Sequence, residues 1–185
     1  YELSAKHNNS FAFIKLGDLY YYGQGFKQDF LQAKKYYELA IQYYNANAYV
    51  NLGNIYFNGK GVKQNYSKAK ECFELAIKHE IDTGYINLAY MYKNGLGVPR
   101  DYLKAKEYYE ITLQHNNYDS LLPLGNLYYE GQGVEKNYIM AKKYYKQSSS
   151  LGNLISANKL GDMYFNGQGV KQNYLKAIKY YELSA

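Results

Sequence analysis

The sequence repeats itself every 36 residues without a gap, and this period constrains the fold more than any other feature. A leucine, a tyrosine and an alanine each recur at this step in all five copies, and the leucines are Leu16, Leu52, Leu88, Leu124 and Leu160. The segment YELSA stands both at 1–5 and at 181–185. A fixed period between about 20 and 50 residues is typical of solenoids and propellers.

Each unit contains two apolar patterns that predict helices. In the first unit, Ala12, Leu16, Leu19 and Tyr20 share one helical face, and we name this first segment of a repeat helix A. A Gly-x-Gly loop follows, beginning at Gly23, and glycine readily takes up the positive φ that ends a helix. The second segment, helix B, has Phe30, Ala33, Tyr37 and Ala40 on one face. No alternating pattern competes as a strand.

An acidic or amide residue precedes every predicted helix B. Such side chains accept hydrogen bonds from the free amides of a first helical turn, so we predict N-caps at Asp29, Asn65, Asp101, Asn137 and Asn173. Pro99 is expected in a loop. Pro123 falls near the start of the fourth helix A, where a missing amide costs least, and a local distortion is expected if that helix begins well before Asp119.

A single hairpin buries its apolar face only partly, so the array rather than the repeat is the expected stable unit. We therefore predict an all-α solenoid of five 36-residue helix-loop-helix repeats that forms one array over 1–185. Residues 1–10 are interpreted as the end of a preceding helix B. The predicted helix pairs cover about 11–44, 47–80, 83–116, 119–151 and 155–185.

The repeated residues follow the pattern A-x3-LG-x2-Y-x2-GxGV-x2-(D/N)-x3-A-x2-YY, as in ANAYVNLGNIYFNGKGVKQNYSKAKECFELA. This pattern resembles the Sel1-like repeat of the tetratricopeptide superfamily and covers essentially the whole chain. The chain departs from the family in having mostly Tyr-Tyr where Trp-Tyr is frequent, Ala89 in place of one glycine, and none of the disulfides of cysteine-rich members. No enzymatic role of those members is carried over.

The resemblance implies a right-handed superhelix with A helices inside and B helices outside. It also implies an adaptor that binds proteins, with a protein or peptide held in the groove lined by the A helices. A structural segment of a longer solenoid or filament, assembling head to tail, is the alternative. No paired acids, triad or metal spacing indicates an enzyme, and no cofactor or metal is expected.

If the A helices line a groove, three rows of side chains turn away from the core and form the candidate partner site. The first row is mostly short amides and carboxylates able to bind a peptide backbone: Asp18, Asn54, Tyr90, Asn126 and Asp162. The second is largely aromatic: Tyr21, Phe57, Lys93, Tyr129 and Phe165. The third row is Tyr22, Asn58, Asn94, Glu130 and Asn166, although Lys93 and Glu130 are not counted as candidate binding residues. Packing against a neighbouring repeat, or simple exposure, explains the same residues equally well.

Other reactive residues have structural interpretations. His7, His79 and His115 share one repeat position near the end of helix B, so they are too far apart to share a metal and suit a helix C-terminus. Cys72 replaces a tyrosine at its repeat position and is expected to pack. Lysines such as Lys34 and Lys70 alternate with glutamates on helix B and indicate a solvated face.

Composition limits the remaining possibilities. The net charge of +6 is a mild excess spread along the chain, so a nucleic-acid partner is not expected. No run of about 18 apolar residues could cross a bilayer. The single cysteine excludes an intramolecular disulfide and weakly favours a reducing compartment, but the compartment stays open.

Overall fold

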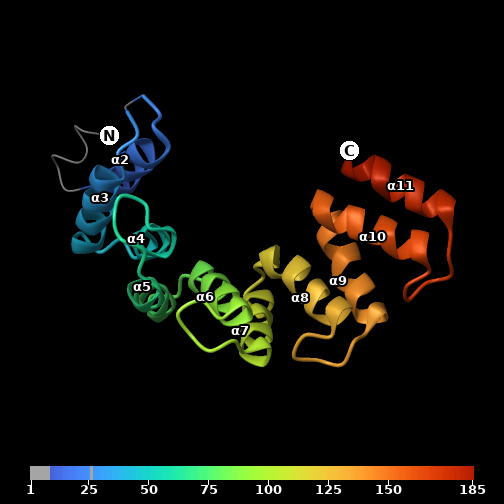
Figure 1. Ribbon diagram of the computed structural model, residues 1–185. Coiled ribbons are helices and arrows are strands. Elements are labelled where there is room, and N and C mark those ends of the chain that lie inside the picture. The colour runs from blue at the N-terminus through green and yellow to red at the C-terminus, as the bar shows by residue number, and fades with distance from the viewer. Residues whose placement is uncertain (1–8, 26) are drawn as a thin grey trace. The chain divides into compact units, whose positions relative to one another are not determined.

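The computed structural model describes residues 9–25 and 27–185, and these residues form an all-α protein (Figure 1). Within them, ten α-helices pair into five hairpins, which confirms the predicted fold class. The predicted helix end at 1–10 lies almost wholly outside the described residues, and the handedness of the superhelix stays a prediction. The helices are α2 (Ser10–Tyr22), α3 (Phe30–Gln42), α4 (Asn47–Asn58), α5 (Tyr66–Lys78), α6 (Thr83–Asn94), α7 (Tyr102–Gln114), α8 (Leu121–Glu130), α9 (Tyr138–Ser150), α10 (Leu154–Asn166) and α11 (Tyr174–Ser184).

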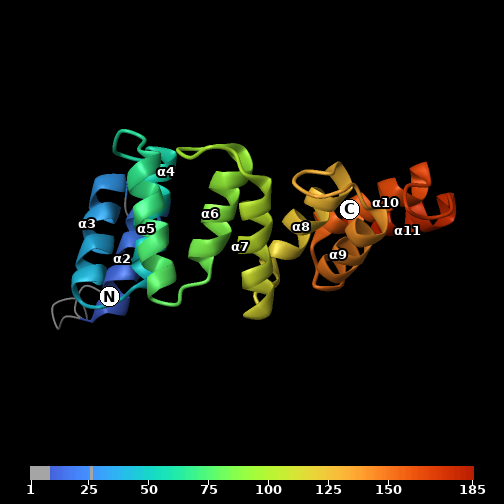
Figure 2. The same cartoon turned by 90° about the horizontal axis from the view of Figure 1, so that it is seen from below.

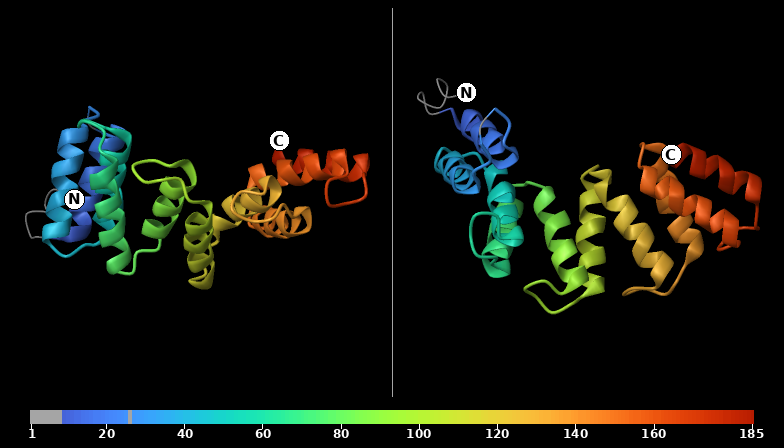
Figure 3. Two further views of the ribbon diagram at one scale, coloured as in Figure 1. Left: turned by 60° about the horizontal axis from the view of Figure 1, so that its bottom comes forward. Right: turned by 45° about the horizontal axis from the view of Figure 1, so that its top comes forward.

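The described chain divides into two compact units. The first contains the described residues up to Leu88 together with Leu96–Val98, and the second contains Ala89–Gly95 and Pro99–Ala185. In the first unit α2 pairs with α3, α4 pairs with α5, and α3 packs on α4 (Figure 2). In the second unit α8 pairs with α9, α10 pairs with α11, and α9 packs on α10 (Figure 3).

A glycine on helix A lets the two helices of a hairpin approach closely. A Cβ at Gly17 would lie 2.4 Å from the ring of Tyr37, and one at Gly125 would lie 2.5 Å from the ring of Tyr145. Gly53 and Gly161 meet the rings of Phe73 and Tyr181 in the same way. At these four glycines the aromatic ring of helix B therefore occupies the space that a side chain would need, whereas the third repeat has the small Ala89 at the same position.

All five predicted N-caps of helix B are confirmed. The side chain of Asp29 accepts a hydrogen bond from the amide of Leu31 at 2.9 Å, and that of Asn65 accepts one from Lys68 at 3.0 Å. Asp101, Asn137 and Asn173 make the same bond at the starts of α7, α9 and α11. Each cap fixes the point at which its loop becomes a helix.

The two glycines of each loop have different tasks. The first, as at Gly59, has φ near +66° and ends helix A. The second lies against the preceding repeat: a Cβ at Gly61 would come within 2.7 Å of Phe30 Cβ, and one at Gly133 within 2.5 Å of Tyr102 Cβ. At Gly25 no atom of the described residues lies within 4 Å of such a Cβ. The second glycine therefore forms a joint between neighbouring repeats.

The fourth repeat begins irregularly, near its proline. A 3-10 turn, η1 (Tyr118–Ser120), precedes α8, and Pro123 is the third residue of that helix. Because the amide missing at Pro123 belongs to the first turn, it removes no bond within the helix. Pro99 lies in the loop after α6, as predicted.

Buried hydroxyl groups join the repeats of the second unit. Thr112 on α7 is hydrogen-bonded to Ser120, and Ser156 on α10 donates to Ser148 on α9 at 2.8 Å. In the first unit the equivalent residues are Ala40 and Ala48, both fully buried. The repeats thus keep their spacing with either a small apolar pair or a satisfied polar pair.

Cys72 occupies a packing position, as predicted. Cys72 lies on α5 and is buried in one core cluster with Ala40 of α3 and Ile55 of α4. Burial raises the pKa of its thiol to about 11, and the nearby Glu71 acts in the same direction. The thiol is therefore protonated and unreactive at neutral pH.

We predict that stability falls with pH through this thiol. An unfolded cysteine ionises near pH 8.5, whereas the folded one keeps its proton up to about 11, so ionisation over this interval favours the unfolded state. The free energy of unfolding should drop by about 2 kcal/mol more in the wild type than in Cys72→Ala between pH 8 and pH 10.5. Urea titrations at both pH values measure this. Equal losses in the two proteins would contradict it.

A second prediction concerns strain after α3. Tyr44 has φ of +62° and is 97% exposed, so its backbone is strained while its ring contributes little burial. The fourth repeat has Gly152 at the equivalent position. Tyr44→Gly should raise the free energy of unfolding by about 1 kcal/mol. Tyr44→Ala keeps the strained Cβ and is the control, so an equal gain in both variants would argue against strain.

Candidate functional site

The first predicted row is tied to the B helices by tyrosine hydroxyls. Tyr37 donates to Asp18 Oδ1 at 2.9 Å, and Tyr145 donates to Asn126 Oδ1 at 2.8 Å. Tyr181 donates to Asp162 at 2.9 Å. The two residues of each pair are 19 positions apart in the sequence, and the bond recurs in the first, fourth and fifth repeats.

Burial strengthens this arrangement electrostatically. It raises the pKa of Tyr37, and the neighbouring Asp18 carboxylate raises it further, so the phenol stays protonated and keeps donating. Burial likewise raises the pKa of Tyr145. One carboxylate oxygen of Asp18 and the side-chain oxygen of Asn126 thus serve the hairpin. The second oxygen of Asp18, the free lone pair of Asn126 Oδ1 and the amide NH2 of Asn126 are what these side chains can still offer a partner.

The second repeat lacks this hydroxyl because Phe73 stands where the others have tyrosine. Asn54, the row member of that repeat, lines a small pocket of about 60 Å³ in the first unit. The other residues of the pocket are Asp18, Tyr21, Tyr22, Tyr37 and Asn51. A water molecule occupies about 30 Å³ of liquid, so the pocket suits one small polar group.

The aromatic row packs on the start of helix B in its own repeat. Tyr21 meets the ring of Phe30 edge-on with centroids 5.3 Å apart, and Phe57 meets Tyr66 at the same distance. Tyr129 and Phe165 make the same contact with Tyr138 and Tyr174 at 5.2 and 5.4 Å. Tyr21, Phe57 and Tyr129 are partly buried by this packing, and Phe165 is the one exposed ring of these four.

The third row marks the last turn of helix A. Tyr22 is 65% exposed. Asn58 donates from its side chain to the backbone oxygen of Asn54 at 2.9 Å, and Asn94 donates to that of Tyr90 at 2.8 Å. These amides help to close the helix ends, and their carbonyl oxygens remain acceptors.

In the first unit the structure therefore brings four predicted site residues together in one pocket: Asp18, Tyr21, Tyr22 and Asn54. Two further lining residues, Tyr37 and Asn51, do not belong to the predicted rows. Asn51 donates to Asp18 Oδ1 at 3.5 Å. The 19-residue spacing between Asp18 and Tyr37, repeated in later copies, was the available signal.

The other residues with reactive groups have structural positions. His79 and His115 are the C-terminal caps of α5 and α7, whereas His7 lies outside the described residues. In the part of the chain that the structure describes, no cluster of histidine, cysteine, aspartate and glutamate could hold a metal ion. The described helices are also all too short or too polar to cross a membrane.

Lysines on the B helices pair with glutamates one turn later. Lys34 lies 2.5 Å from Glu38 and Lys106 lies 2.7 Å from Glu110, and Lys70 pairs with Glu74. Lys104 instead lies over the ring of Tyr92, with its nitrogen 4.4 Å from the centroid. The three ion pairs offset part of the positive charge along this face, and the contact with Tyr92 stabilises the Lys104 cation without removing its charge.

Solved structures similar to this chain share its repeats. A protective antigen of uropathogenic Escherichia coli with an SLR fold has 33% sequence identity and a TM-score of 0.83 over 97% of this chain. This chain spans only 38% of that structure. A Sel1 repeat protein from Oxalobacter formigenes has 28% identity and a TM-score of 0.87, covering 96% of this chain and 72% of the other.

A more distant similarity involves an immunity protein of Pseudomonas aeruginosa, Pa5087. It has 25% identity and a TM-score of 0.58, covering 83% of this chain and 56% of the other. No curated protein sequence matches the chain significantly.

The family comparison agrees with the five hairpins. The profile described as Sel1 repeat matches residues 12–42, 46–80, 83–117, 121–153 and 154–185. The resemblance inferred from the repeated motif is confirmed, and the chain belongs to the Sel1 repeat family.

Proposed function

We propose that this chain is a protein-binding scaffold that holds an extended segment of a partner against the exposed side of its A helices. The small polar pocket of the first unit carries the proposal. It brings residues of two neighbouring repeats together, Asp18 from α2 and Asn54 from α4, around a space suited to one backbone carbonyl or side-chain amide.

Exposed aromatic rings beside polar groups support the same conclusion. Tyr22 lines the pocket and is largely exposed, and in the second unit Tyr90 and Phe165 are each exposed on an A helix. Aromatic side chains supply large contact areas at low entropic cost and are enriched at protein interfaces. A partner segment that binds there would combine ring contacts with hydrogen bonds to its backbone.

The family gives independent support. Sel1 repeat proteins typically serve as scaffolds without catalytic activity. Two similar structures are named as a protective antigen and as an immunity protein, and neither name describes an enzyme. The identity of a partner for this chain is a separate question, which peptide selection addresses directly.

The test is selection of binders from a random peptide library, followed by affinity measurements on variants. The double variant Tyr22→Ala/Asn54→Ala removes one ring and one amide from the pocket without touching the buried core. We expect the selected peptides to bind it at least about tenfold more weakly, the loss typical of a residue at the centre of an interface. Isothermal titration calorimetry measures the affinities.

The matched control is Leu31→Ala on α3. Leu31 is 59% exposed, so its truncation also removes apolar surface from the first unit, but it does not line the pocket. Its affinity should stay within about twofold of the parent. Selected peptides that bind the double variant as tightly as the parent would place the binding surface elsewhere and refute the proposal.

A further inference from the structure

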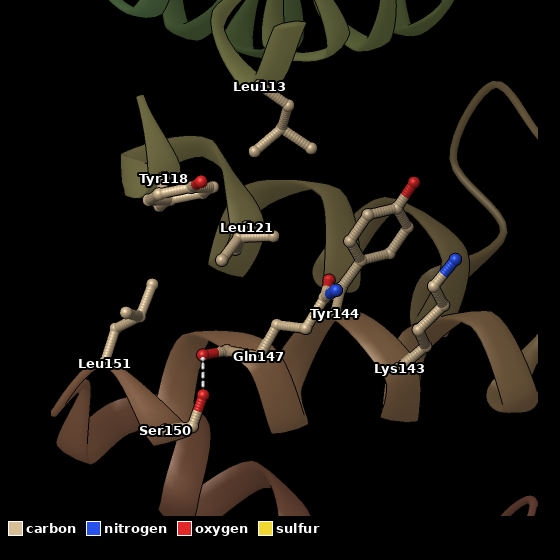
Figure 4. Close-up of a pocket in the computed structure, with 8 residues that line it drawn as sticks. All are labelled: Leu113, Tyr118, Leu121, Lys143, Tyr144, Gln147, Ser150 and Leu151. Carbon is tan, nitrogen blue, oxygen red and sulfur yellow. Dashed lines mark hydrogen bonds between the residues drawn. The ribbon is translucent and has the colours of Figure 1, made fainter. Parts of the chain in front are cut away.

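The second unit contains a larger hollow of about 520 Å³, remote in the sequence from the polar pocket. It opens where the ends of α7 and α9 meet η1 and α8. Figure 4 shows Tyr118 and Leu151 on one side, Tyr144 and Lys143 on the other, and Leu121 between them. Cavities that take up ligands or anchor side chains are typically of about 300–1,000 Å³.

The fourth repeat lacks a pair of rings that the first two repeats have at this place. In the first repeat Phe13 on helix A stacks on Tyr43 at the end of helix B, with centroids 5.3 Å apart. In the second repeat Tyr49 and His79 occupy the same two positions and stack at 5.7 Å. The fourth repeat has Leu121 and Leu151 there. Two leucines, both lining the hollow, therefore stand where the first and second repeats have a stacked pair of rings.

Irregular backbone exposes a further ring at this place. Tyr118 belongs to the 3-10 turn before α8 and is 50% exposed. Leu151, opposite the turn, is 61% exposed. An apolar surface with an accessible aromatic face is thus available at the wall of the hollow.

The edge of the hollow is positively charged. Lys143 stands at a repeat position where the second and third repeats have Glu71 and Glu107 and the first and fifth have lysine. The residues that line the hollow include no acid. An acidic group that entered with an apolar one would therefore meet a favourable charge.

We propose that this hollow binds an aromatic side chain of a partner peptide in which an acidic residue stands next to the aromatic one. The ring takes the place of the stacked pair that the first two repeats supply themselves, and it contacts Tyr118, Leu121 and Leu151. The neighbouring carboxylate pairs with Lys143. None of the three predicted rows lines this hollow, so the two proposals succeed or fail separately.

The absence of tryptophan from the chain provides a clean assay. The probe is an acetylated and amidated pentapeptide with a central tryptophan between two glutamates and a serine at each end. Excitation at the red edge of tryptophan absorption then reports on the probe alone. We expect a saturable blue shift and a rise in anisotropy as the protein is added, because the indole leaves water.

Three variants locate the binding. Leu121→Phe/Leu151→Tyr restores the ring pair of the first repeat and should abolish the blue shift, with circular dichroism confirming the fold. Lys143→Glu should weaken binding by roughly fivefold or more through loss of the ion pair. Lys146→Glu changes the net charge equally on the same helix without lining the hollow, and should leave binding unchanged.

Specific results would overturn the proposal. These are the absence of a saturable shift, wild-type binding by Leu121→Phe/Leu151→Tyr, or equal losses in Lys143→Glu and Lys146→Glu. A probe whose tryptophan stands between two lysines should bind more weakly than the glutamate probe. If both bind equally tightly, the acidic residue plays no part in recognition. Equally tight binding of free indole-3-acetate would assign the hollow to small molecules and overturn the peptide assignment.

Discussion

The contact between the second loop glycine of one repeat and the start of helix B in the preceding repeat governs how neighbouring hairpins meet. At Gly61, Gly97, Gly133 and Gly169 the built Cβ would lie 2.3 to 2.7 Å from an atom of that helix. The backbone can reach this position only with a positive φ and without a side chain. The loop is therefore fixed at both ends, by this joint and by the N-cap that follows it.

Some residues on the surface of the A helices also hold the helix pairs together. The loop geometry sets each helix B against its helix A, and the hydroxyls of Tyr37, Tyr145 and Tyr181 then reach the first row of polar residues. Around Asp18 and Asn54 this surface also forms a small polar pocket. Residues predicted to face a partner therefore also hold the hairpins together.

The large hollow of the second unit lies where the repeats differ. The fourth hairpin has Leu121 and Leu151 where the first two have rings, and it keeps the same loop contact and N-cap. Likewise the hydroxyl pair of Ser148 and Ser156 replaces a pair of alanines without leaving a buried donor unpaired. Repeats can thus change their chemistry locally while the contacts between them persist.

Much of this fold could be predicted from the sequence. The period predicted the five hairpins, the short-range rules predicted the N-caps from Asp29 to Asn173, and repeat position predicted the packing of Cys72. These features depend on contacts that are local or identical in each copy. The candidate partner site was harder to predict, and its residues stay predictions.

The limits have a physical cause. The bond from Tyr37 to Asp18 depends on the distance between two helices, which the close fit of Gly17 determines. The strained backbone of Tyr44 depends on how a helix ends without glycine. The hollow beside Leu121 lies where the fourth repeat has leucines and the first two have aromatic rings. Residues that repeat in every copy do not indicate such a difference.

The most direct test of the account compares alanine at Gly61 and at Gly25, which share a repeat position and a unit. Both substitutions strain a residue with positive φ, but only the Cβ at Gly61 meets a preceding repeat. Urea unfolding should show Gly61→Ala to be less stable than Gly25→Ala by about 1–3 kcal/mol, the usual cost of overpacking. Equal losses in the two variants would contradict the claim that this joint determines how the repeats meet.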